Sequence, residues 1–511
     1  MKRMKILLCL LCTLCLAGCS AAPATPPQPA ATLPPAAVRY TAPTDDAGMS
    51  YIAVRPLYLP SLDGQRLLCQ YESIALSHDR HDAESLVRAL LAHEGNGLVT
   101  SLGEGVRLTL YGDHPIEIAG GVCTVNLGSS ALMLQDKALY TACLAIATTL
   151  CELSDVSSVN VLIADQAPGM DITLTLPLGV VKAHPGEELT VLWEQMEARR
   201  TPLGADPSLM PVSAAATLYF PLADGSGVIP ETRNLSFAGQ SPQQLASDLI
   251  TALSAGAQYV QGTAVMPDLY AWMIYAPQVS DMTDGGRLVT LHFVSDLEHR
   301  LAAAGLDMSC LAASLVHTLT TFIPSVTAVR IDVGSTALTS VYHPEHGSLL
   351  FPGGLLRRSN FFPYLMTLGT VYLASGAHLT PVRRAMPAAE AVSPRILLMH
   401  LMNGPTQPER DAGVESVMPE GLGPQDVLGV SIHGDALILN LSLRFADKIR
   451  FEAAGYEQQL CYAIVNTLCH AKGLRRVVFF FGGSMVETLG GEIYWGGEFL
   501  FSPGMNEQTK G

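Results

Sequence analysis

The sequence predicts an α+β protein made of three tandem modules, each a small mixed β-sheet covered on one face by two helices. One ladder of apolar strands, turns and capped helices occurs three times in the same order. Its strands alternate apolar and polar residues, whereas its helices repeat leucine every four residues. A chain of 511 residues is also long enough for about three domains. We expect the modules at residues 51–205, 212–350 and 366–505.

Each copy opens on an apolar strand that carries a tyrosine and ends in a turn. The three tyrosines, Tyr58, Tyr219 and Tyr372, stand at the same place in their copies and set the alignment. Asp63-Gly64 and Asp224-Gly225 supply typical turn residues after the first two strands.

A helix start follows each tyrosine at a nearly constant distance. Asp82, Ser241 and Ser393 are residue types whose side-chain oxygens cap helices, and proline follows both serines. Gln244 is expected to complete a capping box with Ser241. Four and eight residues beyond each cap lies the apolar stripe expected to face a core, made of Leu86, Leu90, Leu245, Leu249, Leu397 and Leu401.

A central strand and a second helix complete each copy. The apolar side of the strand is formed by Cys123, Val125, Leu127, Val289, Leu291, Phe293, Leu437, Leu439 and Leu441. Its other side carries Asn126, His292 and Asn440, as expected for a sheet with one buried face. The second helix ends in a Thr-Leu pair, and a closing strand follows at 159–163, 329–333 or 477–481. The last copy is expected to end in a β-hairpin over 492–501.

The N-terminus predicts export and lipid attachment. Lys2, Arg3 and Lys5 precede an uncharged apolar run that ends in Leu-Ala-Gly before Cys19. This pattern indicates a lipoprotein signal peptide over residues 1–18, with Cys19 as the acylated residue. An ordinary secretory signal containing cysteines is the alternative. Residues 19–50, rich in Ala, Pro and Thr, are expected to form an extended linker.

Composition narrows the classes of partner. The formal net charge is −16 and no basic stripe is present, which disfavours nucleic acid. A hydrophobic content of 49% with 15% charged residues favours compact modules.

The cysteines beyond Cys19 form a poor disulfide framework. Cys143 and Cys151 occupy the repeat positions of Cys461 and Cys469, eight residues apart on the second helix. That spacing is too long for a disulfide, so we expect small, core-facing residues at these positions.

The most suggestive polar cluster is the run 77–82. It places His78 and His81 beside Asp79 and Asp82, residue types that bind metals. The other copies have no such run, and Asp82 is expected to cap a helix, so a solvated loop is the favoured interpretation. The remaining histidines weighed as site residues are His114, His292, His400 and His433.

Motifs for nucleophiles, zinc or phosphate binding are missing from the sequence. We therefore expect no catalytic residue, no cofactor, no metal site and no enzymatic activity. A catalytic set assembled from distant residues stays a third alternative.

Two stretches resemble the GerMN domain of sporulation and spore germination lipoproteins. Residues 219–225, Tyr-Phe-Pro-Leu-Ala-Asp-Gly, followed by Pro-Glu-Thr-Arg at 230–233, resemble its opening. Residues 463–468, Ala-Ile-Val-Asn-Thr-Leu, resemble its close. The resemblance covers roughly residues 55–500. Family members usually carry two such modules, so a third copy is a departure.

The resemblance implies a non-enzymatic scaffold or assembly protein. It would be anchored through lipid on Cys19 to the outer face of the cytoplasmic membrane and would contact proteins of the envelope or of a sporulation complex. Self-association is an open possibility. The alternative function is an extracytoplasmic lipoprotein that binds a solute or a cell-wall fragment.

Overall fold

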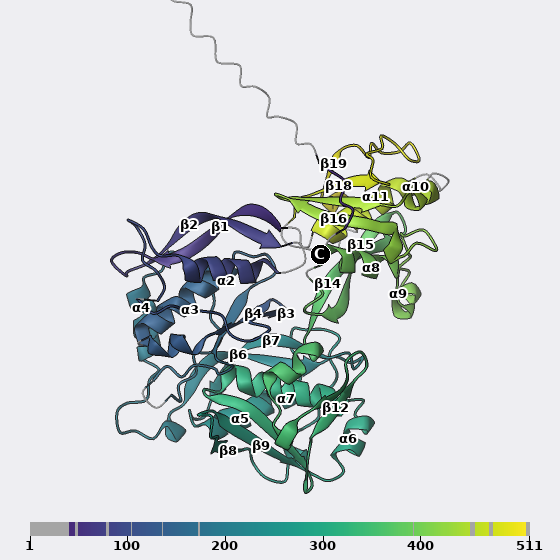
Figure 1. Cartoon of the computed structure of the whole chain (residues 1–511). Helices are drawn as coiled ribbons and strands as arrows, with labels where there is room; N and C mark the ends of the chain where they lie inside the picture. Colours follow the sequence, from purple (N-terminus) through teal and green to yellow (C-terminus); the bar gives the residue numbers. More distant parts are fainter. Residues whose placement is uncertain are drawn as a thin grey trace, which may run out of the picture. The chain divides into compact units, whose positions relative to one another are not determined.

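The computed structural model describes residues 40–45, 50–77, 81–103, 105–134, 136–171, 174–391, 393–449, 455–469 and 474–506. Contacts divide the chain into the units Met1–Thr41 and Ala42–Gly511, and every element below belongs to the second. Small mixed sheets and short helices follow one another along the chain (Figure 1), which confirms the α+β class.

The first segment begins with a hairpin and contains two helices that pack on strands. Its strands are β1 (Ser50–Pro60), β2 (Leu67–Ser77), β3 (Ile116–Ala119), β4 (Val122–Leu127) and β5 (Ser158–Ile163). Its helices are α2 (Asp82–Ala92), α3 (Asp136–Leu150) and α4 (Leu189–Glu197), with 3-10 turns η1 (Ser129–Met133) and η2 (Pro207–Leu209).

The second segment repeats this order. Its strands are β6 (Val212–Pro221), β7 (Val228–Phe237), β8 (Gln278–Asp281), β9 (Arg287–Phe293), β10 (Val326–Val333), β11 (Thr336–Ala337), β12 (Ser340–His343) and β13 (Gly347–Leu350). Its helices are α5 (Pro242–Ser254), α6 (Leu297–Ala303) and α7 (Met308–Phe322), with η3 (Tyr270–Trp272), η4 (Pro352–Gly354) and η5 (Arg358–Tyr364).

The third segment has the same order again. Its strands are β14 (Met366–Ser375), β15 (His378–Pro387), β16 (Val427–His433), β17 (Ala436–Leu441), β18 (Arg476–Phe481) and β19 (Glu498–Leu500). Its helices are α8 (Pro394–Met402), α9 (Gln407–Asp411), α10 (Leu443–Ile449) and α11 (Tyr456–Cys469), with η6 (Pro424–Asp426) and η7 (Pro503–Met505).

Strand pairing is the same in the three segments. Each opens on an antiparallel hairpin, β1–β2, β6–β7 or β14–β15, which forms a sheet of its own. Later in each segment, three strands form a second sheet. Its first two strands are antiparallel and its third is parallel to the second, in the orders β3-β4-β5, β8-β9-β10 and β16-β17-β18. The second helix makes the crossover that a parallel pair requires. The expected limits of the modules stay a prediction.

One hydrogen bond joins the hairpin to the second helix in every segment. The backbone N–H of Tyr58 donates to Thr149 Oγ1 at 2.9 Å, that of Tyr219 to Thr318 Oγ1 at 3.1 Å, and that of Tyr372 to Thr467 Oγ1 at 3.0 Å. The tyrosine and the Thr-Leu pair, which align the copies in the sequence, therefore meet in space.

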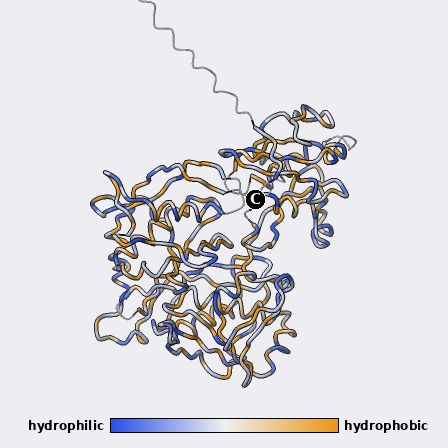
Figure 2. The backbone as a smooth tube through the Cα atoms, viewed as in Figure 1, coloured by the Kyte–Doolittle hydropathy of each residue, from blue (hydrophilic) through white to orange (hydrophobic). Residues whose placement is uncertain are grey.

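The predicted apolar positions form the core. The six stripe leucines and the nine inward-facing strand residues are all buried, and so are Cys143, Ala312 and Cys461 on the second helices. Apolar and polar residues interleave along the coloured part of the backbone (Figure 2), as expected where strands and helices each turn one side inward.

The outer side of the central strands differs from the prediction. His292 is half-buried, but Asn126 and Asn440 are buried, because further parts of the chain cover β4 and β17. Asn126 Nδ2 donates to Asp165 at 2.6 Å, and Asn440 Nδ2 donates to the carbonyl of Pro43 at 2.8 Å. Alternation of apolar and polar residues along a strand indicates that its two faces differ, but it does not show that the polar face is exposed to solvent.

Three local predictions at helix starts were wrong in detail. The cap of α2 is His81, whose Nδ1 accepts from Ala83 N, whereas Asp82 lies inside the helix. Ser241 caps α5, but Gln244 bonds Asp248 instead of closing a capping box. Ser393 stands at the cap position of α8 without a side-chain cap bond.

The terminal hairpin predicted over 492–501 is also wrong. Only β19 is a strand there, and it pairs antiparallel with β18. Trp495 is fully buried, and its Nε1 donates to Glu457 at 2.6 Å, so the glycine-rich stretch folds over a buried tryptophan.

No single helix in the described ranges is long and apolar enough to cross a membrane. The helices α6 and α7 reach that length and composition only as a pair, which bends by 101° between them.

Candidate functional site

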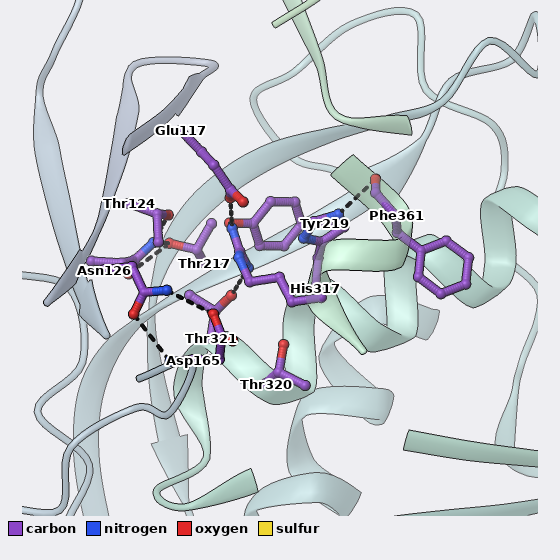
Figure 3. A network of polar contacts seen from close by, with 12 residues as sticks. Glu117, Thr124, Asn126, Asp165, Thr217, Tyr219, His317, Thr320, Thr321 and Phe361 are labelled. Atoms are coloured by element: carbon purple, nitrogen blue, oxygen red, sulfur yellow. Dashed lines mark hydrogen bonds and ion pairs between the residues drawn. The ribbon is translucent and has the colours of Figure 1, made fainter. Parts of the chain in front are cut away.

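A buried polar network lies where the first segment meets the second (Figure 3). We call it the junction network and define it as Glu117, Tyr219, His317, Thr321 and Arg358. These residues come from β3, β6, α7 and η5. The network therefore joins the sheet of one segment to the hairpin and helix of the next.

Arg358 is the centre of the junction network. Its side chain is 5% exposed and donates to Glu117, which is 8% exposed, and to Thr321 Oγ1. It also donates to the Tyr219 hydroxyl at 3.3 Å. Burial opposes the charge of Arg358, but the nearby charge of Glu117 outweighs this and raises the pKa of the guanidinium above its usual value. Removing one partner of such a buried ion pair strongly destabilises the folded protein, because the other charge stays buried without a partner.

His317 lies beside this ion pair and is fully buried on α7. Its Nε2 lies 3.1 Å from the Phe361 carbonyl, which can only accept, so Nε2 carries the proton. The ring stacks on Tyr219 with centroids 5.0 Å apart, and Nδ1 has no hydrogen-bond partner in the described part of the chain. Burial, and then the charge of Arg358, lower the pKa of His317 well below its usual value.

A second contact between these segments lies close to the junction network. Asn160 on β5 donates from Nδ2 to Thr217 Oγ1 on β6 at 3.1 Å and faces Thr124 on β4 at 3.5 Å. All three side chains are buried. Hairpin β6–β7 thus covers the outer side of β3-β4-β5, which explains why the polar side of β4 is not solvated.

This arrangement is suited to holding surfaces in register. The Glu117 carboxylate and the Arg358 guanidinium bind each other, the His317 imidazole donates to the Phe361 carbonyl, and all three groups are buried. The buried ion pair and its hydrogen bonds connect elements of both segments, and buried polar contacts of this kind favour one relative placement of the elements that supply them.

The residues considered from the sequence lie elsewhere. Cys19, His78 and Asp79 fall outside the described residues. His81 bonds Asp155 at 2.7 Å through Nε2, while Asp82 faces Arg55 at 3.5 Å, so both have structural partners. Within the described ranges, no group of three or more His, Cys, Asp or Glu residues is placed to hold a metal.

Two of the other weighed histidines have an aromatic or a carboxylate partner. His114 stacks on Phe362 with centroids 3.6 Å apart, and His292 Nδ1 lies 3.2 Å from Asp332. Burial lowers the pKa of His400. The seven cysteines beyond Cys19 are free, and burial raises the pKa of the Cys143 thiol to about 12, which disfavours a thiolate.

Sequence reasoning missed the junction network. The repeat pattern does not include Arg358, and Glu117 and His317 have no ionisable counterparts in the other copies. The available signal was an ionisable residue inside an otherwise apolar helix, which His317 is, because such residues are rarely buried without a partner.

A cavity of about 760 Å³ lies near these contacts and is lined by all three segments. Gly120, Ser157, Tyr259, Thr370 and Arg383 are among its lining residues. Arg383 is exposed and has no ion-pair or hydrogen-bond partner among the described residues.

Comparison with known proteins gives one family. The model of the Germane family, described as sporulation and spore germination, matches residues 56–167 and 370–487. No curated protein matches the chain.

Solved structures add two similar proteins. The tandem GerMN domains of the sporulation protein GerM from Bacillus subtilis share 17% identity, over 60% of this chain and 99% of that one, with a TM-score of 0.22. A putative lipoprotein from Clostridium perfringens shares 18% identity, over 26% of this chain and 87% of that one, with a TM-score of 0.19.

Proposed function

Because this chain belongs to the GerMN-domain family of sporulation and spore germination proteins, we propose that it is a non-enzymatic, lipid-anchored scaffold outside the cytoplasm. It would present its GerMN-like segments as a connected set of surfaces to proteins of the envelope or of a sporulation complex. The middle segment, which has the same order of elements and the same Thr–Tyr bond as the other two, counts in this proposal as a third module.

The observation that carries the proposal is the junction network. A scaffold needs fixed geometry between its modules, and the Arg358–Glu117 pair with its hydroxyl and aromatic neighbours fixes the first two segments. The two charged groups of this network, Arg358 and Glu117, bind each other across the contact between the segments.

The anchor is proposed from the N-terminal sequence. A positive segment, an apolar run and Leu-Ala-Gly before Cys19 support acylation of that cysteine, and the following Ala/Pro/Thr-rich stretch supplies reach from the membrane. Two or three acyl chains would hold the protein stably at the outer face of the cytoplasmic membrane.

The scaffold function is tested by affinity purification after mild cross-linking of sporulating cells. We expect envelope or sporulation proteins to co-purify with the wild-type chain and to be depleted with a Cys19→Ala variant of equal abundance. Cys15→Ala, inside the signal run, is the matched control. Recovery of the chain alone from cross-linked sporulating cells would contradict the scaffold function.

Binding of an anionic solute or wall fragment is the second candidate, favoured by the cavity and by Arg383, which has no ion-pair partner among the residues that the structure describes. An arginine without a carboxylate partner is suited to a carboxylate or phosphate ligand. Equilibrium dialysis with a muropeptide mixture tests this, with Arg383→Ala as the variant. Arg357→Ala is the control, because Arg357 is partly exposed and pairs with Asp284 outside the cavity. Retention equal in all three proteins would exclude the cavity as the binding site.

A further inference from the structure

A short stretch of chain that precedes β1 in the sequence lies on the third segment. We call this stretch, Ala42, Pro43, Thr44 and Asp45, the strap. The side chain of Asn440 on β17 donates from Nδ2 to the carbonyl of Pro43 at 2.8 Å, across 397 residues of sequence. Pro43 is buried, whereas Thr44 and Asp45 are exposed. The strap therefore packs through Pro43 on the third sheet, β16-β17-β18-β19.

A glycine in β16 leaves room for the strap. Gly429 follows a register shift in this strand, yet its φ is not positive, so its backbone conformation does not require glycine. A Cβ atom at this position would lie 2.5 Å from the carbonyl oxygen of Pro43 and 3.0 Å from the backbone nitrogen of Asp45. Glycine inside a strand often marks the close approach of another backbone, and here that backbone is the strap.

A second glycine lets Asn440 donate to the strap. In the first segment, the equivalent Asn126 accepts from the backbone N–H of Asp165 at 3.0 Å, and its Nδ2 donates to the Asp165 carboxylate at 2.6 Å. In the third segment, Asn440 accepts in the same way from the backbone N–H of Gly483 at 3.0 Å. Gly483 stands, like Asp165, two residues after the closing strand and has a positive φ. Because glycine has no carboxylate, the Asn440 amide donates to Pro43 instead.

The side of the third sheet that meets Pro43 is largely apolar. Strand pairing places Ile438 beside Val478 and Asn440 beside Phe480, so these four side chains share that side. Ile438, Val478 and Phe480 are all buried. The matching positions of the second sheet carry polar side chains, namely Thr290, His292, Arg330 and Asp332. An apolar second side is typical of a sheet that is covered on both sides, and in the described chain the strap supplies part of this cover.

We propose that this side of the third sheet is a binding site for an extended, proline-containing stretch of chain, and that the chain's own strap occupies it. We call the residues of this side, Gly429, Ile438, Asn440, Val478 and Phe480, the strap site. The proposal rests on the proposed lipid anchor at Cys19 and deepens it, because a bound strap attaches the linker that follows Cys19 to the third segment. The strand β1 follows the strap and also contacts β16, so the same attachment holds the first hairpin beside the third segment.

Photo-cross-linking of the lipid-free chain, residues 20–511, tests the strap site. The photoreactive residue benzoylphenylalanine is introduced in place of Thr44, which is exposed and therefore accommodates a larger side chain. Cross-linked peptides are then mapped by mass spectrometry. We expect labelling of the peptide that contains β16 and β17, with a yield that does not change with protein concentration. A yield that rises with concentration would assign the site to the strap of a second copy and would overturn the proposal.

Two further variants release the strap from opposite sides of the contact. Gly429→Val places a side chain where the Pro43 carbonyl lies, and Pro43→Asp places a charge against the apolar side of the sheet. Each should lower the yield of the cross-link at least about tenfold. Gly504→Val, where a Cβ meets nothing within 4 Å, and Pro35→Asp, in the linker, are the matched controls and should leave the yield unchanged. Pro43→Asp alters no residue of the sheet, so the test stays valid if Gly429→Val fails to fold.

Labelling of other parts of the chain, or labelling that neither variant reduces, would overturn the proposal. Membrane fractionation of the acylated protein separates this result from a failure of the anchor. Gly429→Val and Pro43→Asp keep Cys19, so both should stay in the membrane fraction although their strap is released. Cys19→Ala should leave the membrane fraction and keep the cross-link. A failed strap site therefore leaves the anchor standing, and a failed anchor leaves the cross-link unchanged.

Discussion

At the scale of single residues, the buried ionisable side chains show how the first two segments contact each other, which the repeat pattern does not predict. The Arg358–Glu117 pair and His317 break the threefold similarity of the sequence, and they do so where two segments meet. Burying charge is costly without compensation, so a charged pair at this place fixes how the two segments fit together.

Removing one member of the Arg358–Glu117 pair should be strongly destabilising. We expect Arg358→Leu or Glu117→Leu to lower the free energy of unfolding by about 3–5 kcal/mol, because the remaining charge stays buried and unpaired. The double variant should lose much less than the two single losses added together. Urea denaturation of the four proteins measures this cycle.

The neighbouring arginine provides the control for this cycle. Arg357 pairs with Asp284 at 3.1 Å where both are partly exposed, so Arg357→Leu should cost no more than about 1 kcal/mol. If Arg358→Leu proves as mild as Arg357→Leu, the junction network does not hold the two segments.

His317 should make stability depend on pH. The folded protein keeps the ring neutral, because its pKa is lowered, whereas the unfolded chain takes up a proton below about pH 6.5. Stability is therefore lost as pH falls below that value, by up to about 1.4 kcal/mol per pH unit from this residue. Urea midpoints measured from about pH 7 to pH 5 should show a shallower fall in His317→Gln. Exposed His299→Gln should leave the fall unchanged.

At the scale of elements, the second helix organises each segment. It contacts the opening hairpin on one side and the mixed sheet on the other, through α3, α7 or α11. Its threonine accepts from the tyrosine backbone, and its small residue, Cys143, Ala312 or Cys461, lets it approach its neighbours closely.

The threonine bond should have a similar weight in all three segments. Thr149→Val, Thr318→Val and Thr467→Val each leave the tyrosine N–H without its acceptor, so we expect a loss of about 1–3 kcal/mol in every case. Thermal and urea unfolding measure it. Thr320→Val is the control, since its hydroxyl donates only to Val316 of its own helix. A loss confined to one segment would show that the bond is not an equivalent part of the three.

Enlarging the small residue of the second helix should be worse. Cys143→Arg, Ala312→Arg and Cys461→Arg each force a charge into a buried contact or push the helix away, at a cost of several kcal/mol. Gln458→Arg, exposed on α11, should melt like the wild type. Normal melting of all three arginine variants would refute the alignment of the helices.

At the scale of the whole molecule, contacts between distant parts of the chain decide which surfaces remain available. Hairpin β6–β7 occupies the first sheet, and residues near Pro43 cover part of the third, while the outer side of the second sheet stays open. Where the chain resides depends on its N-terminus, which lies outside the described residues.

Acylation at Cys19 should hold the protein on the membrane. We expect Cys19→Ala to shift the chain from the membrane fraction to the soluble extracytoplasmic fraction, measured by fractionation and by mass spectrometry of the N-terminal peptide. Cys12→Ala, in the signal run, should not change the distribution. Membrane retention of Cys19→Ala without any acyl chain would contradict the anchor.

The sequence by itself determined the α+β class, the order of strands and helices, the buried leucine stripes and the family. These follow from periodicity and turn chemistry, which act between residues near one another in the chain. The sequence also placed Tyr219 and Thr318 at repeated positions, but it did not predict the hydrogen bond between them.

Only the tertiary structure decided the rest. His81 replaced Asp82 as the cap, the glycine-rich end folded over Trp495, and Arg358 found Glu117 across a large gap in sequence. The same alternating strand is half-exposed at His292 and buried at Asn126, because burial of a second face depends on which distant segment packs there. A local sequence pattern determines which side of a strand is apolar. Whether the other side is buried depends on long-range packing, which no local pattern encodes.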